Sequence, residues 1–200
     1  MSKKDIGLQL KLTGLHMTIN HPTYEKPLYF FADAIKMVIK DIERASEDMD
    51  AEELQFVIYE DIEFIETLLS ASFLVIQTYI TLVLEKAKAL CKNSHESHAD
   101  YKKRILKKGP SFDENYSKIE ILWALANYVK HNEEWTQDIW KNPEAKQEVK
   151  AVGLRLGSTG NLRKAAKALG NENFSDTSVF IKIVDDWAKE IYEEASSAST

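Results

Sequence analysis

The spacing of apolar residues changes along this chain and predicts an extended arm followed by helices. Apolar and other residues alternate strictly over residues 6–12, a period-two pattern typical of a strand or an extended arm. Pro22 and Pro27 lengthen the connection, because the residue before a proline disfavours helical backbone. We therefore expect an extended N-terminal arm over residues 1–27 and a first helix over residues 28–46. The alternating apolar residues are Ile6, Leu8, Leu10 and Leu12.

A second helix, predicted over residues 51–90, is the longest element of the pattern. This stretch contains no proline or glycine, and apolar residues recur at every third or fourth position. Between Glu66 and Glu85 lie 18 uncharged residues, about 27 Å of helix and just enough to cross a membrane. Polar residues within that stretch favour a central core helix, also available as a dimer interface, over a membrane span. They are Thr67, Ser70, Ser72, Gln77, Thr78 and Thr81.

Shorter elements are predicted in the second half of the chain. A polar and basic connection is expected over residues 91–112, followed by a third helix over residues 113–140 whose first residues are acidic. A short helix is expected over residues 161–169, with Gly170 just after its end. The last helix should begin after Asp176, whose side chain can cap it, and run to about residue 194.

The composition agrees with a single helical domain. The chain has 200 residues, of which 44% are hydrophobic and 29% charged, and only 7 are glycine and 4 proline. These values predict an all-α fold, and together with the apolar spacing they predict one helical bundle over residues 28–195 with its C-terminal helices over 144–195. The single cysteine, Cys91, fits a reducing compartment, and no long apolar stretch follows the N-terminal lysines. We therefore expect a cytoplasmic protein.

The net charge of -6 conceals a strong charge polarity. Residues 41–66 hold eleven carboxylates against one base, whereas residues 100–167 hold fourteen bases against nine acids. A dipolar protein can present its basic face to the phosphates of RNA. Two alternatives remain at this point: solvated charged surfaces, or an acidic segment that binds the basic segment of a second copy. The densest basic run contains Lys102, Lys103, Arg104, Lys107 and Lys108.

One helical row carries the candidate catalytic chemistry. Trp123, Asn127, His131 and Trp135 follow one another at four-residue spacing, and Lys130 lies beside them. An imidazole transfers protons near neutral pH, an amide can orient it, and an ammonium can meet an anion. The alternative is structural, with both tryptophans in the core and the Asn127 amide hydrogen-bonded to the His131 imidazole.

This helix resembles the signature helix of the HEPN superfamily, compact helical proteins common in prokaryotic toxin–antitoxin and defence systems. The family signature is an arginine, a polar residue, three to five further residues and a histidine. Asn127 matches the polar position and His131 the histidine, whereas Ala126 occupies the arginine position. The order of helices over about residues 28–140 is also similar to that fold.

The resemblance implies metal-independent RNA cleavage in a composite site at a homodimer interface. It implies proton transfer by His131 and a phosphate contact by the arginine, which Ala126 cannot make; Asn127 and Lys130 complete the candidate catalytic group. Superfamily members without the full motif are thought to serve as binding or scaffolding domains. We therefore interpret the chain as a non-catalytic or weakly active module that binds RNA, a cognate antitoxin or another partner. The alternative is an endoribonuclease that uses His131.

Two further stretches suggest anion or metal binding. The glycine-rich segment over residues 153–164 is not a Walker A loop, but the helix that follows could hold a phosphate at its N-terminus. Cys91, His95, His98 and Asp100 lie within ten residues, yet no second cysteine or histidine cluster accompanies them, so we predict no metal site and no cofactor. The candidate phosphate ligands are Lys102, Lys103, Arg104, Arg155, Arg163 and Lys164.

Overall fold

The computed structural model describes residues 22–90, 96–135, 137–141, 146–172 and 174–197 and confirms the all-α prediction. Within these ranges the regular structure is helical, apart from one isolated β-bridge between Ser111 and Ser117. The strand or extended arm predicted over residues 6–12 lies outside the described residues.

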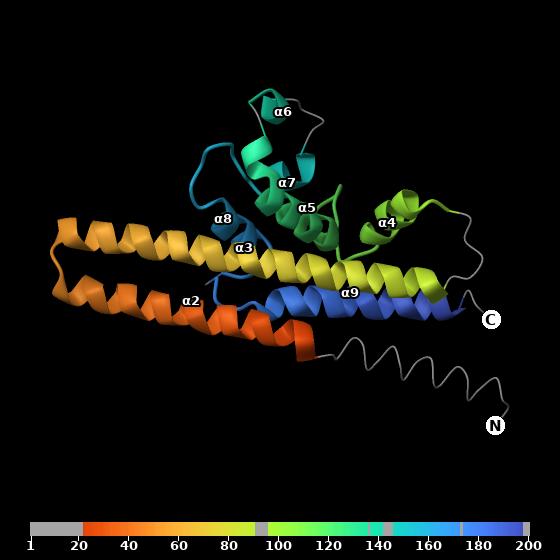
Figure 1. The fold of residues 1–200 in the computed structure, drawn as a ribbon, viewed down its shortest axis with the longest axis horizontal. Coiled ribbons are helices and arrows are strands. Elements are labelled where there is room, and N and C mark those ends of the chain that lie inside the picture. Colours follow the sequence, from red (N-terminus) through yellow and green to blue (C-terminus); the bar gives the residue numbers. More distant parts are fainter. Residues whose placement is uncertain (1–21, 91–95, 136, 142–145, 173, 198–200) are drawn as a thin grey trace.

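The first two helices of the described residues form a long antiparallel hairpin (Figure 1). Helix α2 spans Pro22–Asp48 and α3 spans Ala51–Leu90, the bounds predicted for the second helix. The first helix begins earlier than predicted, so the extended arm is wrong over residues 22–27. Pro22 is the first residue of α2, a position where the missing N–H of proline costs no hydrogen bond, whereas Pro27 lies inside the helix. Asp50 then caps α3, because its Oδ1 accepts the Glu52 and Glu53 N–H groups at 2.9 and 3.0 Å.

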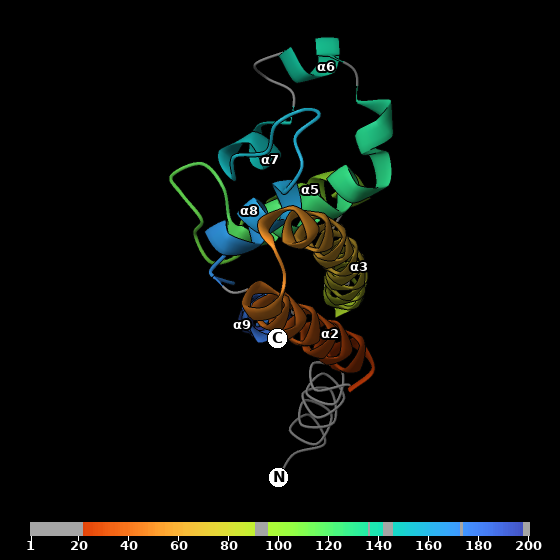
Figure 2. The ribbon, with the colours of Figure 1, turned by 90° about the vertical axis from the view of Figure 1, so that its left-hand side faces the viewer.

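Helix α3 is the centre of the fold. Helix α9 (Ser178–Ser197) and α2 pack along one side of it, while α5 (Lys118–His131) and α8 (Asn161–Ala168) pack on the other (Figures 1 and 2). Among the described residues, α3 is the one helix long and apolar enough to span a membrane, and 56% of that apolar window is buried inside the protein. Its buried side chains begin at Ile65 and continue to Ala87. The core is therefore built around the second half of α3.

A helix that the sequence analysis missed lies in the predicted basic connection. Helix α4 spans His98–Leu106, and Ser97 caps it by accepting the Asp100 N–H at 3.1 Å. Tyr101 and Ile105 are buried and lie four residues apart, which is one face of a helix. Two anchors one turn apart thus hold this short helix on the core although most of its residues are polar.

The predicted third helix over residues 113–140 is wrong in its length. Helix α5 is followed by a 3-10 turn, Asn132–Glu134, and by the short helix α6, Gln137–Lys141. Helix α5 starts late because of a capping box at Ser117: Ser117 Oγ accepts the Glu120 N–H at 3.0 Å, and Glu120 Oε2 accepts the Ser117 N–H at 2.9 Å. The residues before this cap form a turn around Asp113, whose Oδ1 accepts the Tyr116 N–H at 2.9 Å.

The C-terminal helices follow their predicted caps. Helix α7 spans Gln147–Ala151 and leads into α8, which ends one residue before the predicted end. Gly170 has a φ of 99°, and the Asn171 N–H donates to the Ala166 carbonyl at 2.9 Å, a Schellman ending. Asp176 Oδ1 accepts the Ser178 N–H at 3.2 Å at the start of α9. These local signals were sufficient to place both helices.

Candidate functional site

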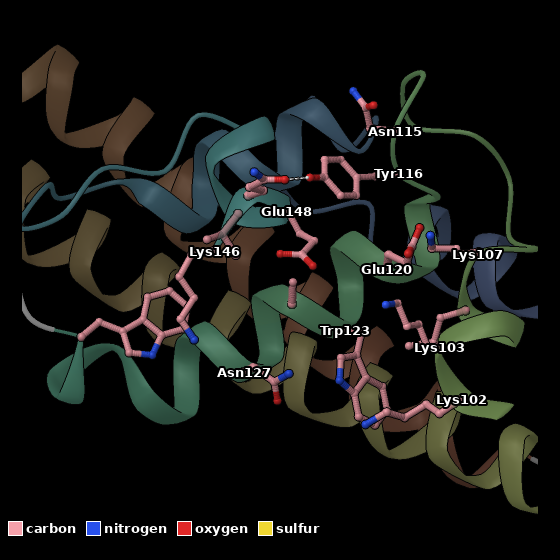
Figure 3. Close-up of a pocket in the computed structure, with 15 residues that line it drawn as sticks. Lys102, Lys103, Lys107, Asn115, Tyr116, Glu120, Trp123, Asn127, Lys146 and Glu148 are labelled. Carbon is pink, nitrogen blue, oxygen red and sulfur yellow. Dashed lines mark hydrogen bonds between the residues drawn. The ribbon is translucent and has the colours of Figure 1, made fainter. Parts of the chain in front are cut away.

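A cavity of about 540 Å³ opens where α4, the α4–α5 connection, α5 and α7 meet (Figure 3). Helix α4 contributes Lys102 and Lys103, with Lys107 directly after it, and Lys146 enters from the start of α7. The Lys146 side chain comes from a part of the chain about forty residues away. Four ammonium groups therefore surround one opening, which makes it the strongest candidate for an anionic ligand. The aromatic residues of its lining are Tyr116, Trp123 and Trp135.

Two of the four lysines lie on indole rings. Lys102 Nζ is 4.7 Å from the centre of the Trp123 ring, and Lys146 Nζ is 4.0 Å from the centre of the Trp135 ring. A cation over an indole face is attracted by the negative face of the ring. Each pair thus places a positive charge and a flat apolar surface at the same wall of the cavity.

Lys103 and Lys107 have no ion pair within the described part of the chain. Their neighbours are engaged: Arg104 binds both carboxylate oxygens of Glu96, at 3.1 and 2.8 Å, and Lys108 pairs with Glu194. The hydrogen bond from Arg104 lowers the pKa of Glu96. The predicted basic run is therefore divided, because Lys103 and Lys107 remain available to a ligand while Arg104 does not.

The cavity also contains two carboxylates with different roles. Glu120 belongs to the capping box of α5, whereas Glu148 of α7 has no hydrogen bond or ion pair among the described residues. The nearby Tyr116 hydroxyl donates to Gln147 Oε1 at 2.8 Å. Burial raises the pKa of Tyr116, and the charge of Glu148 raises it further. This tyrosine therefore stays protonated beside the free carboxylate.

The structure does not gather the candidate catalytic group in one place. Gln77 Nε2 donates to Asn127 Oδ1 at 3.0 Å, and Lys130 Nζ donates to Gln77 Oε1. The exposed His131 instead lies beside Glu134, with Nδ1 and Oε1 separated by 3.3 Å. The expected alternative, a bond between Asn127 and His131, is not formed. Two of the three residues thus join α5 to α3, and the third lies at the surface.

The position that matches the family arginine faces the interior. The Ala126 side chain is 0% exposed, so a guanidinium at this position would enter the core. Trp135, expected on the same helical row as His131, follows the 3-10 turn and packs against the Tyr128 ring at 5.4 Å between centroids. The row predicted from spacing therefore ends with α5.

The predicted phosphate site at the start of α8 is already filled by a carboxylate of this chain. Glu66 Oε2 accepts the Leu162 N–H at 3.0 Å, and its Oε1 accepts Arg163 N–H and Nε–H at 3.1 and 2.9 Å. This contradicts the assignment of Arg163 and the helix N-terminus to an external anion. Arg155 and Lys164 are exposed, and neither lines the cavity beside α4.

The metal alternative receives no support from the described residues. Cys91 and His95 lie outside them, and His98 is exposed at the start of α4. Within the described part of the chain, no three histidine, cysteine, aspartate or glutamate residues are placed to hold a metal ion.

Sequence reasoning missed Glu148, which α7 brings to the cavity, and its candidate phosphate ligands did not include Lys107 or Lys146, although Lys107 belongs to the predicted basic run. The Lys103–Lys107 spacing of four was a usable signal, since it places both on one side of a helical turn. No comparable signal linked α7 to α4.

Comparison with protein-family models, curated proteins and solved structures gives no match.

Proposed function

We propose that this protein is a non-catalytic module that binds single-stranded RNA in the cavity between α4, α5 and α7. The observation that carries the proposal is that Lys103 and Lys107, which have no ion pair among the described residues, line the same cavity as Trp123. Single-stranded nucleic acids are bound by positive charge along the backbone together with aromatic surfaces on which bases stack. An RNA duplex is too wide for a 540 Å³ cavity, whereas splayed nucleotides of a single strand fit.

The proposal also includes a cellular location, an oligomeric state and a biological system, all taken from the HEPN resemblance. We place the protein in the cytoplasm, as a homodimer without a membrane span, in a prokaryotic defence or toxin–antitoxin type system with a cognate antitoxin or other partner. Three observations favour a binding role over catalysis. Ala126 lies in the core, Lys130 donates a hydrogen bond to Gln77, and His131 lies at the surface. None of these residues supplies the bidentate phosphate contact of an arginine.

The test is a titration of fluorescein-labelled single-stranded RNA of mixed sequence, followed by anisotropy. The Lys103→Ala/Lys107→Ala double variant should bind about tenfold more weakly, because two phosphate contacts are lost. Its plot of log affinity against log salt should flatten by roughly 0.7 for each contact. Lys189→Ala on α9, an exposed lysine outside the cavity, is the matched control and should bind as wild type. Equal affinity of the double variant and wild type would refute the proposal.

The second candidate function is a metal-independent ribonuclease, and the His131–Glu134 pair is the observation in its favour. A carboxylate beside Nδ1 leaves Nε2 to exchange protons with a substrate. The discriminating measurement is cleavage of a mixed RNA pool in EDTA by wild type and His131→Ala. Cleavage that falls about 10²–10⁴-fold in His131→Ala would establish this second function. Absence of cleavage by both, with RNA binding retained, is the outcome expected for the binding module.

A further inference from the structure

Glu148 is the carboxylate of the cavity that no other group satisfies. Its side chain is half-buried and points into the space between α5, α7 and the lysines at the end of α4 (Figure 3). Within the described residues it makes no hydrogen bond and no ion pair within 4 Å, although Lys103, Lys107 and Lys146 line the same cavity. The described part of the protein thus keeps an unpaired carboxylate in a cavity that four lysines line.

A free carboxylate opposes the binding of phosphate, so the part of a ligand that it contacts should carry hydrogen-bond donors instead. Carboxylate oxygens only accept hydrogen bonds, and a half-buried carboxylate is best satisfied by a ligand that offers two donors side by side. The lysines can meet the backbone of an RNA strand, a contact that positions the strand without reading its sequence. Glu148 is then placed to read a base.

We infer that the cavity selects guanine, with Glu148 accepting both donors of the Watson–Crick edge of that base. This inference rests on the proposed RNA-binding function and names its specificity. Guanine presents N1–H and the N2 amino group as neighbouring donors that match the two carboxylate oxygens. Adenine and cytosine present one amino group beside an acceptor, and uracil presents one N–H between two carbonyl oxygens. The acceptors of these three bases would face the carboxylate and weaken the contact.

The other carboxylate of the cavity cannot take this role without loss. Glu120 Oε2 holds the Ser117 N–H in the capping box, so engaging it with a base would uncap α5. Aromatic groups of the cavity complete a base site: the half-buried Tyr116 ring lies near Glu148, and Trp123 lines the cavity beside Lys102. Such rings stack on any base and therefore add affinity without selecting among bases.

The experiment uses four labelled RNA hexamers that differ at one position: UUGUUU, UUAUUU, UUCUUU and UUUUUU. Wild type should bind the guanine hexamer about tenfold more tightly than the other three, the discrimination expected of a bidentate contact. Glu148→Gln should bind all four within about twofold, because an amide offers one acceptor and presents a donor to guanine N1–H or N2–H. Circular dichroism verifies that the variant is folded.

Two controls separate this inference from the proposed function. Glu133→Gln, at an exposed carboxylate outside the cavity, should retain the guanine preference. Lys103→Ala should weaken all four hexamers by the same factor, since it removes a phosphate contact. Equal wild-type binding of the four hexamers, or a guanine preference that survives Glu148→Gln, would overturn the inference and leave RNA binding intact. Failure of wild type to bind any hexamer would overturn both.

Discussion

At the residue scale, one buried amide explains why a catalytic-looking group is structural. The Gln77 side chain of α3 donates to the Trp123 carbonyl at 3.3 Å and to Asn127 Oδ1 at 3.0 Å, and it accepts from Lys130. Buried polar atoms are costly unless they are hydrogen-bonded, so Gln77 requires partners on the helix that covers it. Asn127 and Lys130 supply them. Asn127 and Lys130 lie three residues apart on α5, and this spacing directs both side chains to Gln77 as readily as it would direct them to a ligand.

A second residue-scale feature is the repulsion between carboxylates where α2 faces α3. Burial raises the pKa of Asp61, and the charges of Asp41 and Glu60 raise it further. The folded state therefore disfavours the ionised Asp61 more than the unfolded state does. This destabilisation is fully present above the raised pKa and disappears as the pH falls below the ordinary value of 3.8, where both states are protonated.

Asp61→Asn should therefore raise the thermal midpoint by roughly 1–2 °C at pH 7, and the gain should vanish near pH 3. Thermal unfolding followed by circular dichroism at both pH values measures it. Asp33→Asn is the matched control, because Asp33 faces Lys36 at 3.5 Å and its removal should not stabilise. A gain for Asp61→Asn that is as large at pH 3 as at pH 7 would contradict the electrostatic explanation.

At the element scale, the N-terminus of α8 is held by a side chain from another helix. Gly160 precedes α8 with a φ of 75° and has no side chain to cap it. Glu66 of α3 accepts the first free N–H groups instead and pairs with Arg163. Only 15% of the Glu66 side chain and 26% of the Arg163 side chain are exposed, so solvent screens this pair weakly. The contact fixes α8 and the glycine-rich segment on α3.

Glu66→Gln should lower the free energy of unfolding by about 1–3 kcal/mol, because one charge-assisted acceptor is lost and Arg163 is left without its partner. Urea unfolding followed by circular dichroism is the measurement. Glu63→Gln, one turn earlier on the exposed face of α3, should stay within about 0.5 kcal/mol of wild type. A Glu66→Gln variant as stable as the Glu63→Gln control would show that Glu66 does not hold α8.

At the scale of the whole molecule, the α2–α3 hairpin extends beyond the body of the fold. No side chain over residues 41–64 is buried, whereas α3 is buried repeatedly from Ile65 onward. The end of the hairpin and α4 lie at opposite ends of α3 (Figure 1). The acidic residues around the hairpin turn, over 41–53, are therefore kept away from the lysine-lined cavity, which leaves the cavity open to a polyanion.

This gradient of burial predicts a gradient of local stability. Amide hydrogens over residues 41–64 should exchange at least tenfold faster than those over residues 65–87, because few buried contacts oppose local opening there. Hydrogen–deuterium exchange followed by mass spectrometry measures both segments in one experiment. Equal protection of the two segments would contradict the prediction. If residues 41–64 were protected at high protein concentration and lost that protection on dilution, a second copy of the chain would cover the hairpin. Phe56 and Tyr59 of the hairpin are 65% and 60% exposed.

The sequence by itself determined the all-α class, both ends of α3, the C-terminal cap of α8 and the N-terminal cap of α9. Each depends on residues close together in the chain: a period near 3.6, the absence of proline and glycine, or an Asp or Gly at a helix end. Tertiary structure alone decided that Glu66 fills the anion site of α8, that Gln77 binds Asn127 and Lys130, and that Glu148 lines the same cavity as the lysines around α4. These placements bring together residues tens of positions apart. Their partners are selected by how the helices pack on α3, and no fixed spacing in the sequence encodes that packing.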